Sequence, residues 1–281
     1  MKKRKIFPVL VLMIFLALLT GVVASLRFSD TTGDLQKGNQ NGPRPPVKKA
    51  EEDFYTIADY SASGPADPQK RTLRKLRSKR YNMRSSKGVD PKRFTITEQR
   101  ESSFGGPPSH APIEPALPAA QSDAVVIGEV IDAEAFLTED KTSILSEFTI
   151  HVTELLKENP LAPFSVGQSL NAIRAGGAVR FPSGKLIRYG HEGKPLPRVG
   201  RQYVFFLKYN DDGGRDYLIL TAYEVRGGLI FPLDGIGLSG NVEPAYAEYQ
   251  KYNGVDESRF RSEVFDAIAR NLGPKPEVTR P

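Results

Sequence analysis

Hydrophobic and polar residues alternate along several short segments between residues 124 and 231, which predicts a domain built mainly from β-strands. Within 144–156, residues 147–153 alternate strictly between polar and apolar, which indicates a strand with one wet side. The run 203–207 is apolar on both faces and predicts a central strand. Glycine turns such as Gly227-Gly228 separate these segments as in hairpins. A small antiparallel barrel is expected, because closure removes exposed strand edges.

One helix is predicted after the strands. Apolar residues recur every three or four positions after Phe260, which indicates an amphipathic helix over about 257–272. Asp256 or Ser258 can cap its first turn, and Gly273, followed by proline, ends it. The expected order of the domain is therefore a β-barrel followed by one C-terminal amphipathic helix.

The N-terminal 27 residues read as a membrane anchor. An apolar run over 6–26 follows four cations at positions 2–5. About 21 helical residues span roughly 31 Å, close to the bilayer's hydrocarbon thickness of about 30 Å. Cations before the run place the N-terminus in the cytoplasm, so a signal-anchor helix would leave the domain extracytoplasmic on a single-pass protein. Cleavage near Ala24 is the alternative, and it would give a secreted or periplasmic protein.

The segment 28–122 is predicted to be a disordered linker, because it holds 11 prolines and no sustained apolar period. Its sharpest feature is a cluster of cations between 70 and 93, where Asp90 is the single acid. Such a cluster could bind an anionic surface, and a solvated charged linker is the alternative interpretation. The candidate residues for the anionic-surface patch are Lys70, Arg71, Arg74, Lys75, Arg77, Lys79, Arg80 and Arg84.

Composition changes this picture in two ways. The net charge of +6 is uneven: 1–120 carries 21 basic and 11 acidic residues, net +10, and 121–281 carries 18 and 22, net −4. The domain is thus mildly acidic, which argues against nucleic acid as its partner. The chain contains no cysteine, which excludes disulfides, thiolate metal sites and thiol nucleophiles.

Three segments carry a resemblance to known proteins: 122–130 (SDAVVIGEV), 148–157 (FTIHVTELLK) and 199–207 (VGRQYVFFL). In this order they resemble uncharacterised exported bacterial β-domain proteins. They are more distantly similar to the netrin-like barrels that include tissue inhibitors of metalloproteinases. The resemblance implies an OB-like barrel over 123–281. Those inhibitors act through an N-terminal cysteine and disulfides, which this chain lacks, so the resemblance does not imply inhibition.

No catalytic, metal or cofactor motif is identified in the sequence, so no catalytic residue, metal ligand or cofactor is predicted. Basic residues interleaved with aromatics between 174 and 201 could hold an anionic ligand on an OB-like surface. Neutralisation by the nine acids of 123–158 is the alternative. The candidate ligand-binding residues are Arg174, Arg180, Lys185, Arg188, Tyr189, His191 and Arg198.

These observations favour a membrane-tethered, non-enzymatic binding or interaction module. Its expected partners are the membrane, through the N-terminal helix, and an anionic envelope polymer, lipid head groups or another envelope protein. Two alternatives stay open. One is a hydrolase-like envelope enzyme with a dispersed site near Arg188 and His191, and the other is a structural component of an envelope assembly.

Overall fold

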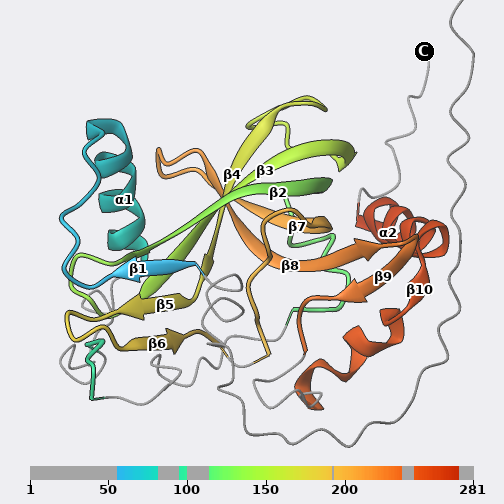
Figure 1. The fold of residues 1–281 in the computed structure, drawn as a ribbon. Coiled ribbons are helices and arrows are strands. Elements are labelled where there is room, and N and C mark those ends of the chain that lie inside the picture. The colour runs from blue at the N-terminus through green and yellow to red at the C-terminus, as the bar shows by residue number, and fades with distance from the viewer. Residues whose placement is uncertain (1–55, 82–94, 100–113, 192, 236–243, 272–281) are drawn as a thin grey trace, which may run out of the picture. The chain divides into compact units, whose positions relative to one another are not determined.

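Strands dominate the structure, a computed structural model that describes residues 56–81, 95–99, 114–191, 193–235 and 244–271 (Figure 1). All of these residues belong to one compact unit, Pro46–Pro281. The fold is mainly β, with a closed five-stranded barrel and a C-terminal helix. The sequence pattern predicts the β class, a small barrel and the helix, but not the number of strands in the barrel.

The barrel is closed by hydrogen bonds between its first and fourth strands along the chain. Around the barrel the strands are β2 (Ala124–Leu137), β3 (Ile144–Lys157), β4 (Ser169–Ala175), β8 (Asp216–Arg226) and β7 (Gln202–Asn210), which returns to β2. Four pairs are antiparallel and β4–β8 is parallel. The expectation of an antiparallel barrel is corrected at this pair. A closed ring with an odd number of strands cannot alternate direction throughout.

Two apolar clusters lie on either side of β7, which explains its unbroken apolar run. Tyr203, Phe205 and Leu207 pack inside the barrel with residues of β3 such as Phe148. Val204 and Phe206 face outward into a second cluster. The prediction of a central strand at 203–207 is therefore confirmed, since both of its faces are buried. The predicted alternation along β3 is confirmed by its burial pattern as well.

The second apolar cluster is covered by the C-terminal part of the chain. After β9 (Leu229–Pro232), the 3-10 helix Pro244–Tyr252 and β10 (Val255–Asp256) lead into α2 (Glu257–Asn271). Asp256 caps α2 by accepting a hydrogen bond from the backbone N–H of Ser258 at 2.9 Å. Phe260 and Val264 of α2 pack onto the cluster, as the helical period predicts.

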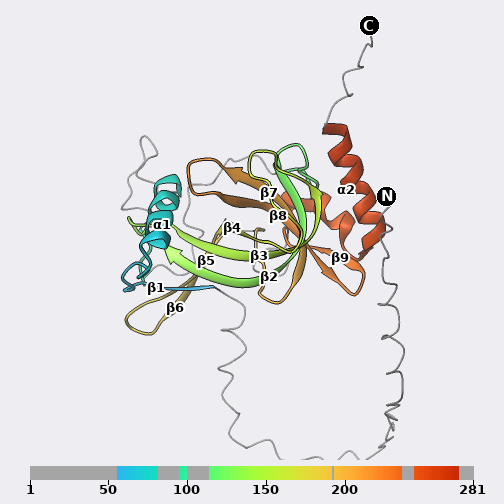
Figure 2. The ribbon, with the colours of Figure 1, turned by 90° about the horizontal axis from the view of Figure 1, so that it is seen from above.

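A three-stranded sheet extends the barrel at the side opposite α2 (Figures 1 and 2). It consists of β1 (Ile57–Asp59), β5 (Gly177–Arg180) and β6 (Leu186–Tyr189), and β1 pairs in parallel with β5. The helix α1 (Pro68–Tyr81) follows β1 along the chain and lies beside the barrel.

Both β1 and α1 lie within 28–122, the segment predicted to be a disordered linker, so that prediction is corrected for residues 56–81. Ala116 and Ala119 are also buried in the cluster under α2, which places residues before 123 in the folded domain. The segments of the chain before residue 123 that the structure describes show no regular spacing of apolar residues. They gain order from strand pairing and from contacts with the barrel.

Among the residues that the structure describes, no helix is long and apolar enough to cross a membrane. The predicted anchor at 6–26 lies outside the described residues and stays a prediction.

Close packing between β2 and β3 requires a glycine at position 128. A Cβ atom there would lie 2.6 Å from Cγ2 of Ile150 and 2.8 Å from the backbone oxygen of His151. Gly128→Ala is expected to lower the free energy of unfolding by about 1–3 kcal/mol, because a buried strand cannot easily move. Urea unfolding of the full chain in detergent measures this change. At Gly64 the nearest atom lies 4.0 Å away, so Gly64→Ala is the matched control; equal unfolding midpoints would contradict the packing.

Candidate functional site

Four carboxylates meet on one side of the barrel, and we call them the acidic face. Glu134 comes from β2, Glu147 from β3, Asp216 from the first position of β8, and Asp212 from the turn before it. Glu134 and Glu147 are direct cross-strand partners in the register. Like charges in that position repel each other, so the face is unfavourable unless cations lie on it.

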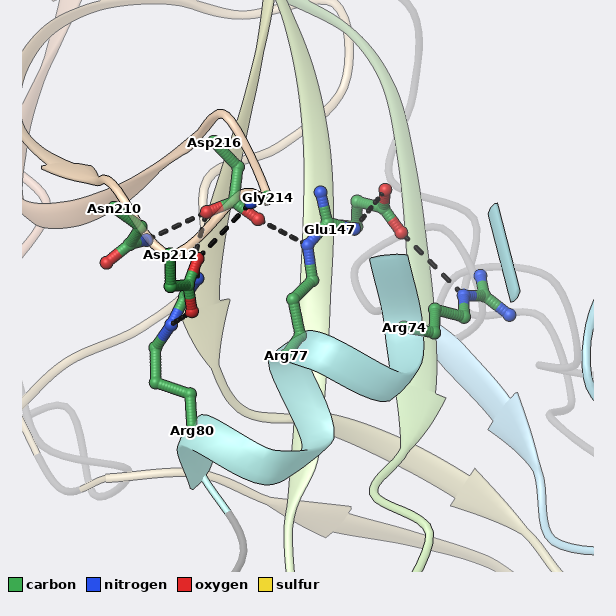
Figure 3. A network of polar contacts seen from close by, with 8 residues as sticks. All are labelled: Arg74, Arg77, Arg80, Glu147, Asn210, Asp212, Gly214 and Asp216. Carbon is green, nitrogen blue, oxygen red and sulfur yellow. Dashed lines mark hydrogen bonds and ion pairs between the residues drawn. The ribbon is translucent and has the colours of Figure 1, made fainter. Parts of the chain in front are cut away.

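The cations come from helix α1. The side-chain oxygen of Asp67 accepts a hydrogen bond from the backbone N–H of Gln69 at 2.9 Å, and Pro68 occupies the first helical position. Both features favour a helix start at this point. Arg74, Arg77 and Arg80 then follow at three-residue intervals, which brings them to one side of the helix. Figure 3 shows all three directed at the acidic face.

Arg77 is the most deeply buried of these arginines, with its side chain fully removed from solvent. Its Nη1 donates to Glu147 at 2.5 Å, and its Nε donates to Asp216 (Figure 3). Burial alone would lower the pKa of Arg77, and the charge of Glu147 together with the hydrogen bond to Asp216 reverses that effect and raises it. The guanidinium is therefore held charged between two strands.

Arg74 and Arg80 flank this buried contact. Arg74 bridges the two facing glutamates, with Nη2 at 2.6 Å from Glu134 and Nε at 3.8 Å from Glu147. On the other side, Arg80 donates from Nε to Asp212 at 2.9 Å and from Nη1 to Asp216 at 3.2 Å. The three arginines thus contact all four carboxylates of the acidic face, and Glu134 and Asp212 keep part of their surface exposed to solvent.

The end of β7 and the turn after it hold the aspartates in place. The amide of Asn210 donates to Oδ1 of Asp216 at 2.8 Å, and the backbone N–H of Gly214 donates to Asp212 at 3.3 Å (Figure 3). Asp216 has no exposed surface, so each of its oxygens needs a donor. The aspartates are oriented by these residues as well as by the arginines.

Charge contributes more than apolar contact to the docking of α1. The buried residues of α1 are Arg77 and Ser78, and its leucines Leu73 and Leu76 are half-buried. Removing ionised groups from water costs nearly as much free energy as their attraction returns. The ion pairs therefore determine where the helix sits more than they add to stability.

This arrangement divides the residues of the predicted anionic-surface patch. Arg74, Arg77 and Arg80 are committed to the acidic face, and Lys70 pairs with Glu134. Arg71 donates to the backbone oxygen of Pro65, which precedes the helix. Lys75 and Lys79 are the patch residues on the solvent side of α1, and Arg84 lies outside the described residues.

The residues of the predicted ligand site on the basic hairpin differ in exposure and do not all lie on one surface. Arg180 and Arg188 are exposed on the outer face of the three-stranded sheet, and Lys185 is in the turn between β5 and β6. Tyr189 alternates with Arg188, so it faces a third apolar cluster, the small core, which includes Val179 and Ile187. There its hydroxyl donates to the backbone oxygen of Thr97 at 3.1 Å. Arg198 is exposed in the loop before β7. The hairpin thus keeps Arg180, Lys185 and Arg188 near one another on its exposed side and turns Tyr189 to the other face.

Arg174, the first residue of that predicted site, is buried and pairs with Asp234. Burial raises the pKa of Asp234, although the charge of Arg174 opposes this effect. His191 has an exposed side chain, yet partial desolvation and the charges of Lys194 and Arg174 lower its pKa. Arg174 is therefore part of the interior, and a surface ligand would not reach it.

The acidic face was not predicted from the sequence. Glu134 and Glu147 belong to the acids of 123–158, for which the sequence suggested neutralisation of the basic hairpin. Instead Glu134 and Glu147 pair with α1, Asp123 with Lys208, and Glu154 with Arg261 of α2. One signal was present, namely the three-residue spacing of arginines in α1, which matches a helical side that can dock on carboxylates.

Comparison with known proteins adds no family assignment: the chain matches no protein-family model and no curated protein. Within the described part of the chain, no group of three His, Asp or Glu side chains is arranged to hold a metal ion. The chemistry of the acidic face is therefore derived from its own contacts.

Removal of the Arg77 charge tests the buried contact. Arg77→Met would leave Asp216 and Glu147 without their shared cation, and the expected loss in free energy of unfolding is about 3 kcal/mol. Urea unfolding of the full chain in detergent measures it. Lys75→Met, on the exposed side of the same helix, is the control and should change that free energy by less than about 0.5 kcal/mol. Equal effects of the two substitutions would refute the contact.

The acidic face also predicts a pH dependence. The hydrogen bond from Arg80 lowers the pKa of Asp212. For Glu134, desolvation opposes the hydrogen bonds from Lys70 and Arg74, and the pKa is lowered as well. Carboxyl groups with lowered pKa values stabilise the fold above their ordinary values of 3.8 and 4.5, and this stabilisation is lost as the pH falls through the folded-state pKa.

The wild-type chain should therefore lose stability more steeply below about pH 4 than a Glu134→Gln, Asp212→Asn variant. Urea midpoints measured from pH 6 to pH 3 show the difference. Parallel curves for the two proteins would mean that these carboxyls do not have lowered pKa values.

Proposed function

We propose that this chain is a non-enzymatic binding module: an OB-like barrel held outside the cytoplasm by the N-terminal segment 6–26, with the acidic face as its ligand surface. The observation that carries the proposal is the complete burial of the Arg77 guanidinium between Asp216 and Glu147. A protein surface that can dehydrate a guanidinium is suited to a positively charged ligand.

The strand order supports the OB-like assignment. With the barrel strands numbered along the chain, their order around the barrel is first, second, third, fifth, fourth, and the third and fifth are parallel. OB barrels are five-stranded Greek-key barrels of this kind. Their ligands bind on the face of the second and third strands and between the loops that follow the first and fourth strands.

The acidic face occupies that position. Glu147 is on the second barrel strand, Glu134 is near the end of the first, and Asp212 is in the loop after the fourth. Helix α1 thus lies where an OB barrel binds its ligand. The partner that fits best is another envelope protein with a basic segment, whereas an anionic polymer would be repelled by these carboxylates.

The proposal of an enzyme around Arg188 and His191 has weaker support. Arg188 is exposed on one face of β6, while Tyr189 is used in the small core on the other face. A dispersed catalytic site would require these side chains to converge on one substrate.

Photocrosslinking in cells that express the full chain tests the proposed ligand surface. A photoreactive residue replaces Asp132 or Asp211, which are exposed next to the acidic face, or Arg188 on the hairpin. Lys251, exposed in the 3-10 helix, is the control position. One recurring adduct from Asp132 and Asp211, not formed from Lys251, is the expected result. Adducts formed only from position 188 would show that the ligand binds at the hairpin, and this result would contradict the proposal.

A further inference from the structure

The contacts of Arg77 are specific for a guanidinium. Two nitrogens of the one side chain donate to carboxylates on two different strands, Nε to Asp216 and Nη1 to Glu147. A planar guanidinium can reach both because its donors point outward in a fixed fork. A lysine side chain carries all its donors on one nitrogen. It therefore cannot place two separate nitrogens against the two carboxylates of this buried site.

The second oxygen of Asp216 adds to this specificity. It accepts from Asn210 at 2.8 Å and from Arg80 at 3.2 Å. The oxygen that faces Arg77 is therefore the one available for the incoming side chain, and its direction is fixed from within the barrel by Asn210 at the end of β7. A donor that fits must approach along this one direction while another of its nitrogens contacts Glu147.

Helix α1 does not satisfy the contact completely. Nη2 of Arg77 is buried and makes no hydrogen bond with the residues that the structure describes. A buried donor without an acceptor weakens binding. The helix also buries few apolar side chains, so its attachment depends largely on charge and on being part of the same chain. A ligand from another molecule that supplies the same arginines and satisfies the last donor can replace it.

We infer that Asp216 and Glu147 form an arginine socket that selects a helical ligand with arginines at three-residue intervals, and that α1 is a resident competitor for this socket. The inference rests on the proposed function, because it assigns the ligand class to the same acidic face. It adds that Asp216 and Glu147 determine specificity and that the partner must displace α1 to bind. Intramolecular attachment gives α1 a high effective concentration, which makes this competition strong.

Two labelled peptides of residues 66–82 test the inference by fluorescence anisotropy. One has the native sequence, and the other has lysine in place of the arginines at 74, 77 and 80. Each is titrated with the full chain in detergent, as wild type and as the Arg74→Gln, Arg77→Gln, Arg80→Gln variant, whose fold is checked by near-ultraviolet circular dichroism. Adding Glu147→Gln and Asp216→Asn to that variant gives the control in which the socket is removed.

The variant should bind the arginine peptide at least about tenfold more tightly than the wild type does, and about tenfold more tightly than it binds the lysine peptide. The control should bind neither. Equal affinity for both peptides would overturn the arginine socket and leave the cationic ligand surface intact. Equal affinity of wild type and variant would overturn the role of α1 as a competitor. A folded variant that binds neither peptide would remove the proposed ligand surface itself.

If the variant does not fold, amide hydrogen exchange of the wild-type chain decides. Excess arginine peptide should accelerate exchange in residues 68–81, because it displaces α1, and the lysine peptide should not. Unchanged exchange with the arginine peptide would overturn the inference.

Discussion

The position of α1 depends on one constraint: a guanidinium that is fully removed from water needs carboxylates that neutralise it and accept its hydrogen bonds. Arg77 meets this need with Glu147, 70 residues later in the sequence, and Asp216, 139 residues later. Both acids are in place only when β3 and β8 stand in the closed barrel. The buried contact therefore couples the segment before the barrel to the barrel's completed topology.

The same constraint explains why the barrel tolerates its own charge. Glu134 and Glu147 face each other across β2 and β3, and Asp212 lies close to Asp216 in the chain. A barrel with this face uncovered would hold several like charges close together. The basic helix removes that repulsion, and it does so on the face that we propose as the ligand surface. Stability and the proposed binding function thus use the same residues and compete for them.

Part of the fold could be predicted because it follows local patterns. The alternation in β3, the two-sided apolar run 203–207 and the helical period after Phe260 each bury the residues that their spacing indicates. The parallel pair β4–β8 could not be predicted, since it follows from closing an odd number of strands. An element could be predicted where the interactions that form it lie within a few residues of one another in the sequence. It could not be predicted where they join distant parts of the chain.

Residues 56–81 resemble a linker in composition because α1 has almost no apolar face. A helix is recognised in a sequence mainly by the regular spacing of its apolar residues, and α1 lacks that spacing. Its order comes from ion pairs with acids more than 60 residues away. Arg174 was misplaced for a related reason: basic residues near one another in the sequence suggested one surface, whereas its partner Asp234 buries it. Charge patterns show which residues need partners and do not show which partners they find.

A double-mutant cycle on Arg77 and Asp216 tests the central claim most directly. The free energies of unfolding of the wild type, Arg77→Met, Asp216→Asn and the double variant give the interaction energy of the pair within the full chain. The structure predicts a coupling of about 2 kcal/mol, since each single substitution leaves the other group buried without its partner. Additive effects within about 0.5 kcal/mol would mean that α1 does not dock through this contact.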